Sequence, residues 1–193
     1  MKLSPSERLI IELLCDIANK KPSDYDTNFI SKAISSQQEW AIPIKYQCLD
    51  DGSPKPLFVS EVYAILETYR WISDTIQSTG ISKDDLKKMV VDNSTAPITF
   101  DGFDGNNESE HLSAARMLID DLGLYQEQSG KANNTHAPRR DAYIKVSNAY
   151  IKELKAAGNY TLQHTIENLV AVLNKGSKLQ MDIVELSALW HRG

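Results

Sequence analysis

Apolar residues recur along most of the chain at the three- and four-residue spacing of an amphipathic helix. The first such segment follows Ser4, which is an N-cap residue, with Pro5 at the first helical position and Glu7 completing a capping box. This predicts a helix that ends near Lys20. Its apolar stripe consists of Leu9, Ile10, Leu13, Leu14 and Ile17.

Further helices are predicted wherever the same spacing continues between capping residues and glycines. The clearest spans Ser60 to Gln77 and is followed by Gly80. Asn107 and Glu110 form another capping box, for a helix that stops at Gly123. The other predicted helices run from Asp26 or Thr27 through Ile34, from Ser82 through Val90, from Pro138 to Gly158, from Thr161 to Gly176 and from Met181 to Trp190.

One stretch interrupts the helical pattern. Ala41 to Pro56 contains three prolines and a glycine, which predicts largely irregular backbone. Four of its residues alternate as in a short strand or extended strip, namely Ile42, Ile44, Tyr46 and Cys48. The polar segment from Gln126 to His136 is predicted to be a loop.

These patterns predict an all-α protein with a single compact domain of about six to seven helices and at most one or two short extended segments. We expect residues 1–176 to form this domain and residues 177–193 to add a C-terminal helical extension packed on it. The main stabilisation should come from burying the apolar stripes, at roughly 1.5–3 kcal/mol for each large side chain.

Composition narrows the possible partners. The formal net charge is −5 and both halves of the chain carry more acidic than basic residues, so nucleic acid is an unfavourable partner. No apolar stretch approaches the roughly 18 residues of a membrane span. The N-terminal segment lacks the features of a signal peptide, and we expect a cytoplasmic protein. Two cysteines have no metal-binding spacing, and Cys15 lies among apolar residues, which predicts a buried reduced thiol.

Polar residues cluster most densely between Ile98 and Tyr125. Two Asp-Gly pairs there invite comparison with a calcium loop, which needs oxygen ligands at positions 1, 3 and 5 and glutamate at position 12. Starting at Asp101 places Phe103 at position 3, and starting at Asp104 places Ala115 at position 12, so both registers fail. The acidic side chains would also repel a phosphate at this helix start. No metal or cofactor is predicted.

Two histidines and two arginines complete the candidate polar cluster. His111 could meet His136 only through tertiary folding, and the two would then form a metal or acid–base site with the nearby carboxylates. Arg139 and Arg140 form the most basic short segment of the chain. Asp121 is a possible internal partner for one of them. No catalytic residue is assigned. The candidate site residues are Asp101, Asp104, Glu108, His111, His136, Arg139 and Arg140.

The run from Phe100 to Glu108, followed by a helix, resembles the signature of the YfbU family. The N-terminal Glu7-Arg8-Leu9-Ile10 helix, the helix Ser60 to Gln77, and His136-Ala137-Pro138 followed by Tyr143 also fit the family pattern in their order. The resemblance covers roughly Leu3 to Lys175. It implies a small, mostly helical bacterial protein of unassigned function, and it supplies no catalytic residue.

Three hypotheses for function follow. The favoured one is a non-enzymatic interaction or regulatory module whose partner is protein, either a second copy or another chain. The first alternative is a metal-dependent hydrolase that uses the Asp/Glu/His cluster, whose side chains should then converge in one pocket. The second alternative is a nucleic-acid-binding regulator with an early helix-turn-helix. The second helix offers only Lys32 as a basic residue, which weakens this alternative.

Overall fold

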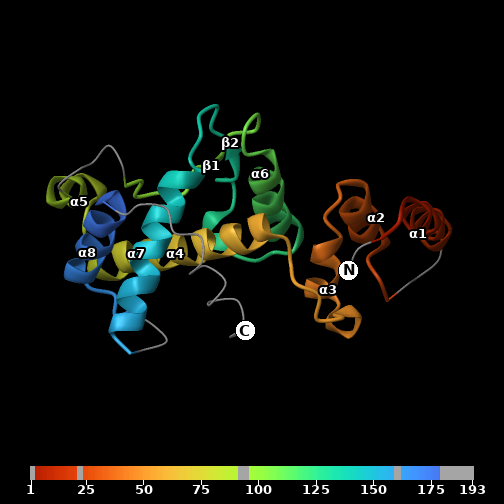
Figure 1. The fold of residues 1–193 in the computed structure, drawn as a ribbon, viewed down its shortest axis with the longest axis horizontal. Coiled ribbons are helices and arrows are strands. Elements are labelled where there is room, and N and C mark those ends of the chain that lie inside the picture. The colour runs from red at the N-terminus through yellow and green to blue at the C-terminus, as the bar shows by residue number, and fades with distance from the viewer. Residues whose placement is uncertain (1–2, 21–23, 91–95, 159–161, 179–193) are drawn as a thin grey trace.

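The structure is a computed structural model that describes residues 3–20, 24–90, 96–158 and 162–178. Over these ranges it contains eight α-helices and one pair of two-residue strands, which confirms the all-α prediction (Figure 1). The helices are α1 (Pro5–Ala18), α2 (Thr27–Ser35), α3 (Ile42–Lys45), α4 (Leu57–Thr79), α5 (Lys83–Met89), α6 (Ser109–Arg116), α7 (Arg140–Ala156) and α8 (Ile166–Lys178). The helices of the described ranges include none that is long and apolar enough to cross a membrane.

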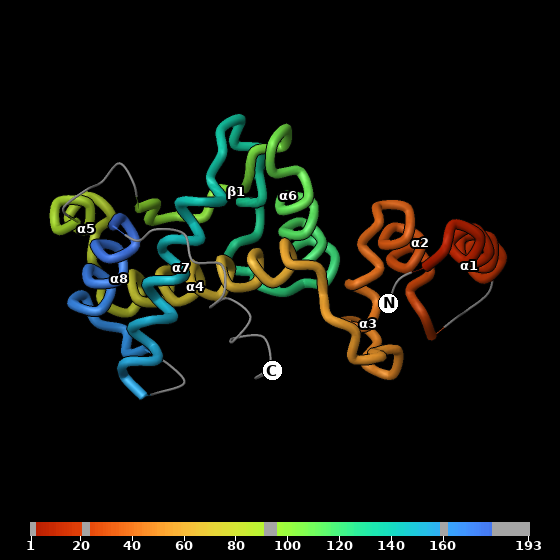
Figure 2. Tube along the Cα trace, viewed as in Figure 1, coloured from red at the N-terminus to blue at the C-terminus, as the bar shows by residue number. Residues whose placement is uncertain are grey.

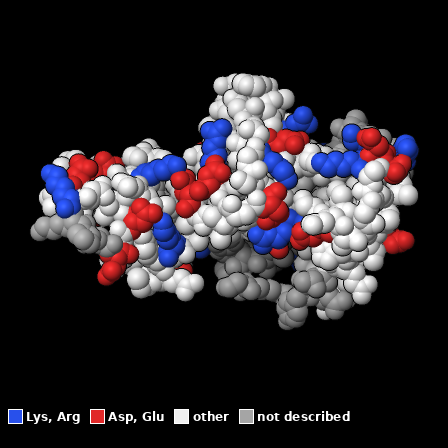
Figure 3. Space-filling model, turned by 180° about the vertical axis from the view of Figure 1, so that it is seen from behind, with Lys and Arg blue, Asp and Glu red and all other residues white. Residues whose placement is uncertain are grey.

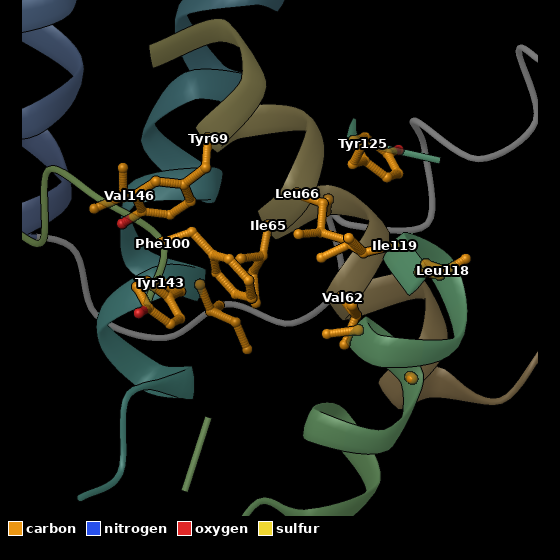
Figure 4. Close-up of a cluster of buried hydrophobic side chains, with 14 of the residues drawn as sticks. Val62, Ile65, Leu66, Tyr69, Phe100, Leu118, Ile119, Tyr125, Tyr143 and Val146 are labelled. Carbon is orange, nitrogen blue, oxygen red and sulfur yellow. The ribbon is translucent and has the colours of Figure 1, made fainter. Parts of the chain in front are cut away.

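Helix α4 is the centre of the fold, because α6, α7 and α8 all pack against it. It begins at Leu57, three residues before the predicted start, and ends at Gly80, whose left-handed backbone (φ +67°) stops the helix. Figure 4 shows how its apolar side meets the core: Tyr69 lies beside Phe100 and Tyr143, with ring centroids 6.3 and 5.1 Å away. The labelled core side chains come from α4, from the π-helical turn that follows α6, from α7, and from Phe100 and Tyr125 in the connecting segments.

A parallel strand pair joins two segments that are far apart in the sequence. Strand β1 (Gly102–Phe103) pairs with β2 (Asn133–Asn134). Gly102 has φ +104°, and a Cβ atom there would lie 2.1 Å from the carbonyl oxygen of Asn133. Only glycine therefore permits the close approach that brings the starts of α6 and α7 together.

The N-terminal helices form one end of an elongated molecule, and α5 and α8 lie at the other (Figures 1 and 2). Helix α2 buries Phe29, Ala33 and Ile34, and Lys32 ties it to Asp121 with a 2.6 Å ion pair. Helix α1 packs on α2. Cys15 of α1 is a buried free thiol, as predicted.

Several predicted boundaries need correction. The segment Ala41 to Pro56 contains α3 between two single 3₁₀ turns, Glu39–Ala41 and Gln47–Leu49, where a short strand was considered. The predicted loop Gln126 to His136 contains a 3₁₀ turn, Gln126–Gln128, and strand β2. Helix α6 stops at Arg116 and continues as a π-helical turn, Met117–Asp121. The predicted helix from Met181 to Trp190 lies outside the described residues, and the extension proposed for 177–193 remains a prediction.

Candidate functional site

Glu61 is a buried carboxylate on the central helix. Its side chain is 2% exposed and receives a two-pronged contact from Arg140 of α7. Arg140 Nη2 lies 2.5 Å from Oε1, and Nε donates to Oε2 at 2.8 Å. His111 of α6 places Nε2 2.7 Å from the same Oε2. Three helices are therefore joined through one carboxylate.

The protonation states follow from this geometry. Burial raises the pKa of Glu61, but the hydrogen bonds from His111 and Arg140 outweigh it and hold the pKa below its usual value. Because an ionised carboxylate only accepts, the 2.7 Å contact requires the proton on Nε2 of His111. Arg140 Nε lies 3.2 Å from Nε2 of His111. Because that nitrogen carries a proton, it cannot accept a hydrogen bond, and Arg140 Nε donates to Glu61 instead. The His111 ring is held between Phe58 and Phe103, at centroid distances of 6.2 and 5.5 Å.

A second buried carboxylate, Glu108, caps the start of α7. Its Oε1 accepts from the backbone N–H groups of Arg139 and Arg140 at 2.9 and 2.8 Å, and Oε2 accepts from the N–H of Asp104 at 3.0 Å. A negative charge at this position also suits the positive end of the α7 dipole. The helix begins at Arg140, two residues after the proline that was predicted to start it.

The predicted capping box between Asn107 and Glu110 does not form. Helix α6 has Glu108 at its N-cap, without a capping hydrogen bond from that side chain. Asn107 instead donates its amide to Asp104 Oδ2 at 2.5 Å. Asp104 accepts hydrogen bonds from the loop before α6, and Glu108 accepts them from that loop and from the start of α7. These bonds compete with the local capping box and replace it.

Asp104 and His136 belong to the loop pair beside this carboxylate. Asp104 is buried and accepts from the N–H of Asn106 at 3.0 Å. Hydrogen bonds from Asn107 and then Asn106 lower the pKa of Asp104, with a smaller effect from the charge of His136. The backbone at His136 is left-handed (φ +53°), and its N–H donates to Oδ1 of Asn134 at 3.0 Å. Oδ1 of Asn134 therefore anchors the His136 turn.

The structure brings some of the predicted site residues together and separates others. Glu108, His111 and Arg140 meet at the starts of α6 and α7, whereas Arg139 contributes its backbone N–H. Asp101 is exposed and accepts from Thr99. Arg140 pairs with Asp141 at 3.0 Å in addition to Glu61. Asp121, a possible partner for Arg139 or Arg140 in the sequence, instead binds Lys32.

The metal-site hypothesis finds no support in this arrangement. Within residues 3–20, 24–90, 96–158 and 162–178, no group of three or more His, Cys, Asp or Glu side chains could hold a metal ion. A cavity of about 320 Å³ lies elsewhere, between the start of α1 and the segment before α4. Its lining includes Trp40, Pro43 and Pro54, and it includes none of the predicted site residues.

Glu61 is the site residue that sequence reasoning missed. In the sequence, Glu61 directly follows Ser60 at the predicted start of the helix, where carboxylates are common. The actual start at Leu57 puts Glu61 on the buried side of α4, directly before Val62. The available signal was its position within the apolar stripe.

Helix α1 presents a second candidate, an exposed apolar surface. Ile11 and Cys15 face the interior, while the predicted stripe points outward, which corrects the expectation that this stripe would be buried. We call these five residues the outer face of α1. Their exposed fractions are 60% for Leu9, 55% for Ile10, 54% for Leu13, 57% for Leu14 and 63% for Ile17.

Comparison with known proteins places both features within one domain. The model of the YfbU domain matches residues 1–175. The chain belongs to the YfbU family. No curated protein and no solved structure matches the chain. The polar cluster and the outer face of α1 both lie inside the YfbU domain.

The two features of this YfbU protein differ in what they can do chemically. Both oxygens of Glu61 and of Glu108 already accept hydrogen bonds from other elements of the chain. Such a cluster holds helices together, whereas a general base needs an acceptor directed at a ligand. The outer face of α1 has the opposite character, because its apolar area is open to a partner.

Proposed function

We propose that this YfbU protein is a non-enzymatic protein-interaction module that binds its partner through the outer face of α1. The observation that carries the proposal is the exposure of five large aliphatic side chains, each more than half exposed, on one side of a single helix. Isolated exposed apolar residues are normal on protein surfaces, but a contiguous group marks an interaction site.

The energy available at this surface is sufficient for association. Fully burying a Leu or Ile side chain contributes roughly 1.5–3 kcal/mol, so covering the exposed half of five of them contributes about 4–7 kcal/mol. Association costs several kcal/mol in lost rotational and translational freedom. The surface can therefore support a moderate interaction by itself and a tighter one with additional contacts around it.

The charge distribution favours a protein partner over nucleic acid. Figure 3 shows basic and acidic side chains interspersed over the face that it displays. The single basic residue of α2, Lys32, is engaged in the ion pair with Asp121. An early helix-turn-helix would therefore have few cations free for phosphate contacts.

The cysteine content of the chain allows a direct test in cells. In a Cys48→Ser background, the exposed native thiol is removed, and burial raises the pKa of the remaining Cys15 thiol and slows its reaction. The test variant is Leu13→Cys in this background. The matched control is Asp84→Cys, at a position on α5 whose native side chain is 87% exposed.

The measured quantity is the rate of maleimide labelling, in the native host and in dilute purified protein. We expect the thiol at position 13 to react at least tenfold more slowly in cells than in dilute solution. The thiol at position 84 should react at similar relative rates in both settings. Equal labelling of both positions in cells would contradict the proposal.

A further inference from the structure

We infer that the partner on the outer face of α1 is a second copy of this chain, so that two copies pair through their α1 helices about a two-fold axis. This inference rests on the proposed function and specifies its partner. It is carried by the geometry of the face, the area that it offers, its place in the molecule and the charges around it.

The outer face is self-complementary in shape. Leu9, Leu13 and Ile17 form one row at four-residue spacing, and Ile10 and Leu14 form a parallel row beside it. Two such rows create the ridges and grooves through which helices pack against helices. Charged residues flank the face and do not interrupt it. An identical helix can therefore fit its ridges into these grooves.

The exposed area agrees with what a dimer needs. Five aliphatic side chains that are 54–63% exposed offer about 100 Å² each, which gives about 500 Å² per copy and about 1,000 Å² for a pair. Specific protein interfaces begin at about 1,000 Å² of total buried area. In a two-fold symmetric pair, the outer face of each copy covers that of the other, so neither face remains exposed and the assembly stops at two copies.

The position of α1 makes this pairing sterically accessible. Figures 1 and 2 show α1 at the outermost end of the elongated molecule, with α2 between it and the α4 core. Its packing within the described chain is mainly against α2. Two copies can therefore approach end to end while the α4 cores remain apart.

Charge argues against an anionic membrane as the occupant. Helix α1 carries Glu7, Glu12 and Asp16 and one basic residue, Arg8. That arginine is held in a 2.6 Å ion pair with Glu39. Helices that lie on membranes combine an apolar face with a basic one, which attracts anionic lipid. The acidic polar side of α1 has the opposite charge.

The test compares the mass of the full chain in solution with and without a charge on the outer face. Sedimentation over a range of micromolar concentrations should give twice the 21.6 kDa monomer mass for the native protein. Leu13→Glu should be monomeric, with the dissociation constant of the dimer raised at least 100-fold. The matched control is Leu57→Glu, because Leu57 is equally exposed (56%) but lies on α4, and this variant should remain dimeric.

Cross-linking locates the contact. Leu13 is the midpoint of the outer face, so it lies near the two-fold axis for either orientation of the paired helices. In the Cys48→Ser background, Leu13→Cys should form a disulfide-linked dimer on mild oxidation, and Asp84→Cys should not. Circular dichroism should show native helix content for every variant, since the substituted side chains are exposed.

The outcomes separate the partner from the proposed function. A dimer that Leu13→Glu leaves intact would refute the pairing through α1. A native monomer whose thiol at position 13 is protected only in cells would refute the second copy and leave an interaction with another protein. A monomer whose thiol is protected even when pure would mean that the chain covers the face itself, and both proposals would fail. A monomer that binds phosphatidylglycerol vesicles through the outer face would also overturn both.

Discussion

Replacing Glu61 by glutamine tests whether the buried carboxylate holds the fold together. The amide keeps the shape of the side chain but removes the charge that Arg140 and His111 contact. Removing one partner of a buried ion pair costs about 3–5 kcal/mol, because the other charge stays buried without compensation. Since the Arg140 side chain is 22% exposed and can retain Asp141, we expect the lower limit, about 3 kcal/mol.

The assay is urea unfolding at neutral pH, followed by a thermal scan. For a chain of this size, about 3 kcal/mol corresponds to a decrease in Tm of about 6–12 °C. The matched control is Glu67→Gln on the same helix. Glu67 is 44% exposed and lies 3.6 Å from Arg70, so its loss should cost less than about 1 kcal/mol. Equal effects of the two substitutions would refute the stabilising role of the buried Glu61 carboxylate.

The pH dependence gives an independent check. The folded-state pKa of Glu61 lies below the ordinary value of 4.5, so its contribution is fully present above that pH and is lost as the pH falls through the folded-state pKa. The stability difference between the native protein and Glu61→Gln should therefore shrink as the pH falls below 4.5. A difference that persists unchanged in acid would mean that packing, and not charge, carries the effect.

Two further predictions concern the segments that bring α6 and α7 together. Glu108→Ala removes the acceptor of three backbone N–H groups and should cost about 2–3 kcal/mol in urea unfolding, whereas Glu110→Ala, on an exposed side of α6, should change stability by less than about 0.5 kcal/mol. A larger loss for Glu110→Ala than for Glu108→Ala would indicate that the Asn107–Glu110 capping box does form. Gly102→Ala should cost more than about 3 kcal/mol because its Cβ would collide with the Asn133 backbone, and Gly80→Ala, with open space around it, should cost about 1 kcal/mol. Similar losses at the two glycines would contradict the steric argument.

The helices could be predicted because their signals are local. Ser4 and Glu7 form the expected capping box, and Ser82 accepts from the N–H of Asp85 as a cap. Each depends on residues three positions apart, and no longer-range hydrogen bond displaces them as it does at Asn107 and Glu110. The apolar spacing of α4 and α7 likewise places their buried residues correctly. These longer helices can therefore be predicted without knowledge of their packing, whereas the short elements α3 and β2 cannot.

The polar cluster could be predicted only in part, because its bonds join distant segments. Glu61 contacts His111 and Arg140, which lie 50 and 79 positions later in the chain. No local sequence pattern predicts either contact. The strands that bring these segments together are two residues long, which is too short for any alternation to be recognised. Sequence reasoning found Glu108, His111 and Arg140 as unusual residues, but it could not identify the carboxylate that connects two of them.

Helix α1 shows a different limit, because its spacing was recognised correctly and its burial was not. Hydrophobic periodicity establishes that a helix has an apolar side, but it does not establish what covers that side. In α1 the narrower strip around Ile11 and Cys15 is sufficient to pack on α2, and the wider stripe remains outside. A helix that packs within one chain and a helix that packs between two chains obey the same rule, since both bury aliphatic rows. The distinction appears only when the fold is known, and here the fold leaves the larger of the two apolar sides of α1 more than half exposed.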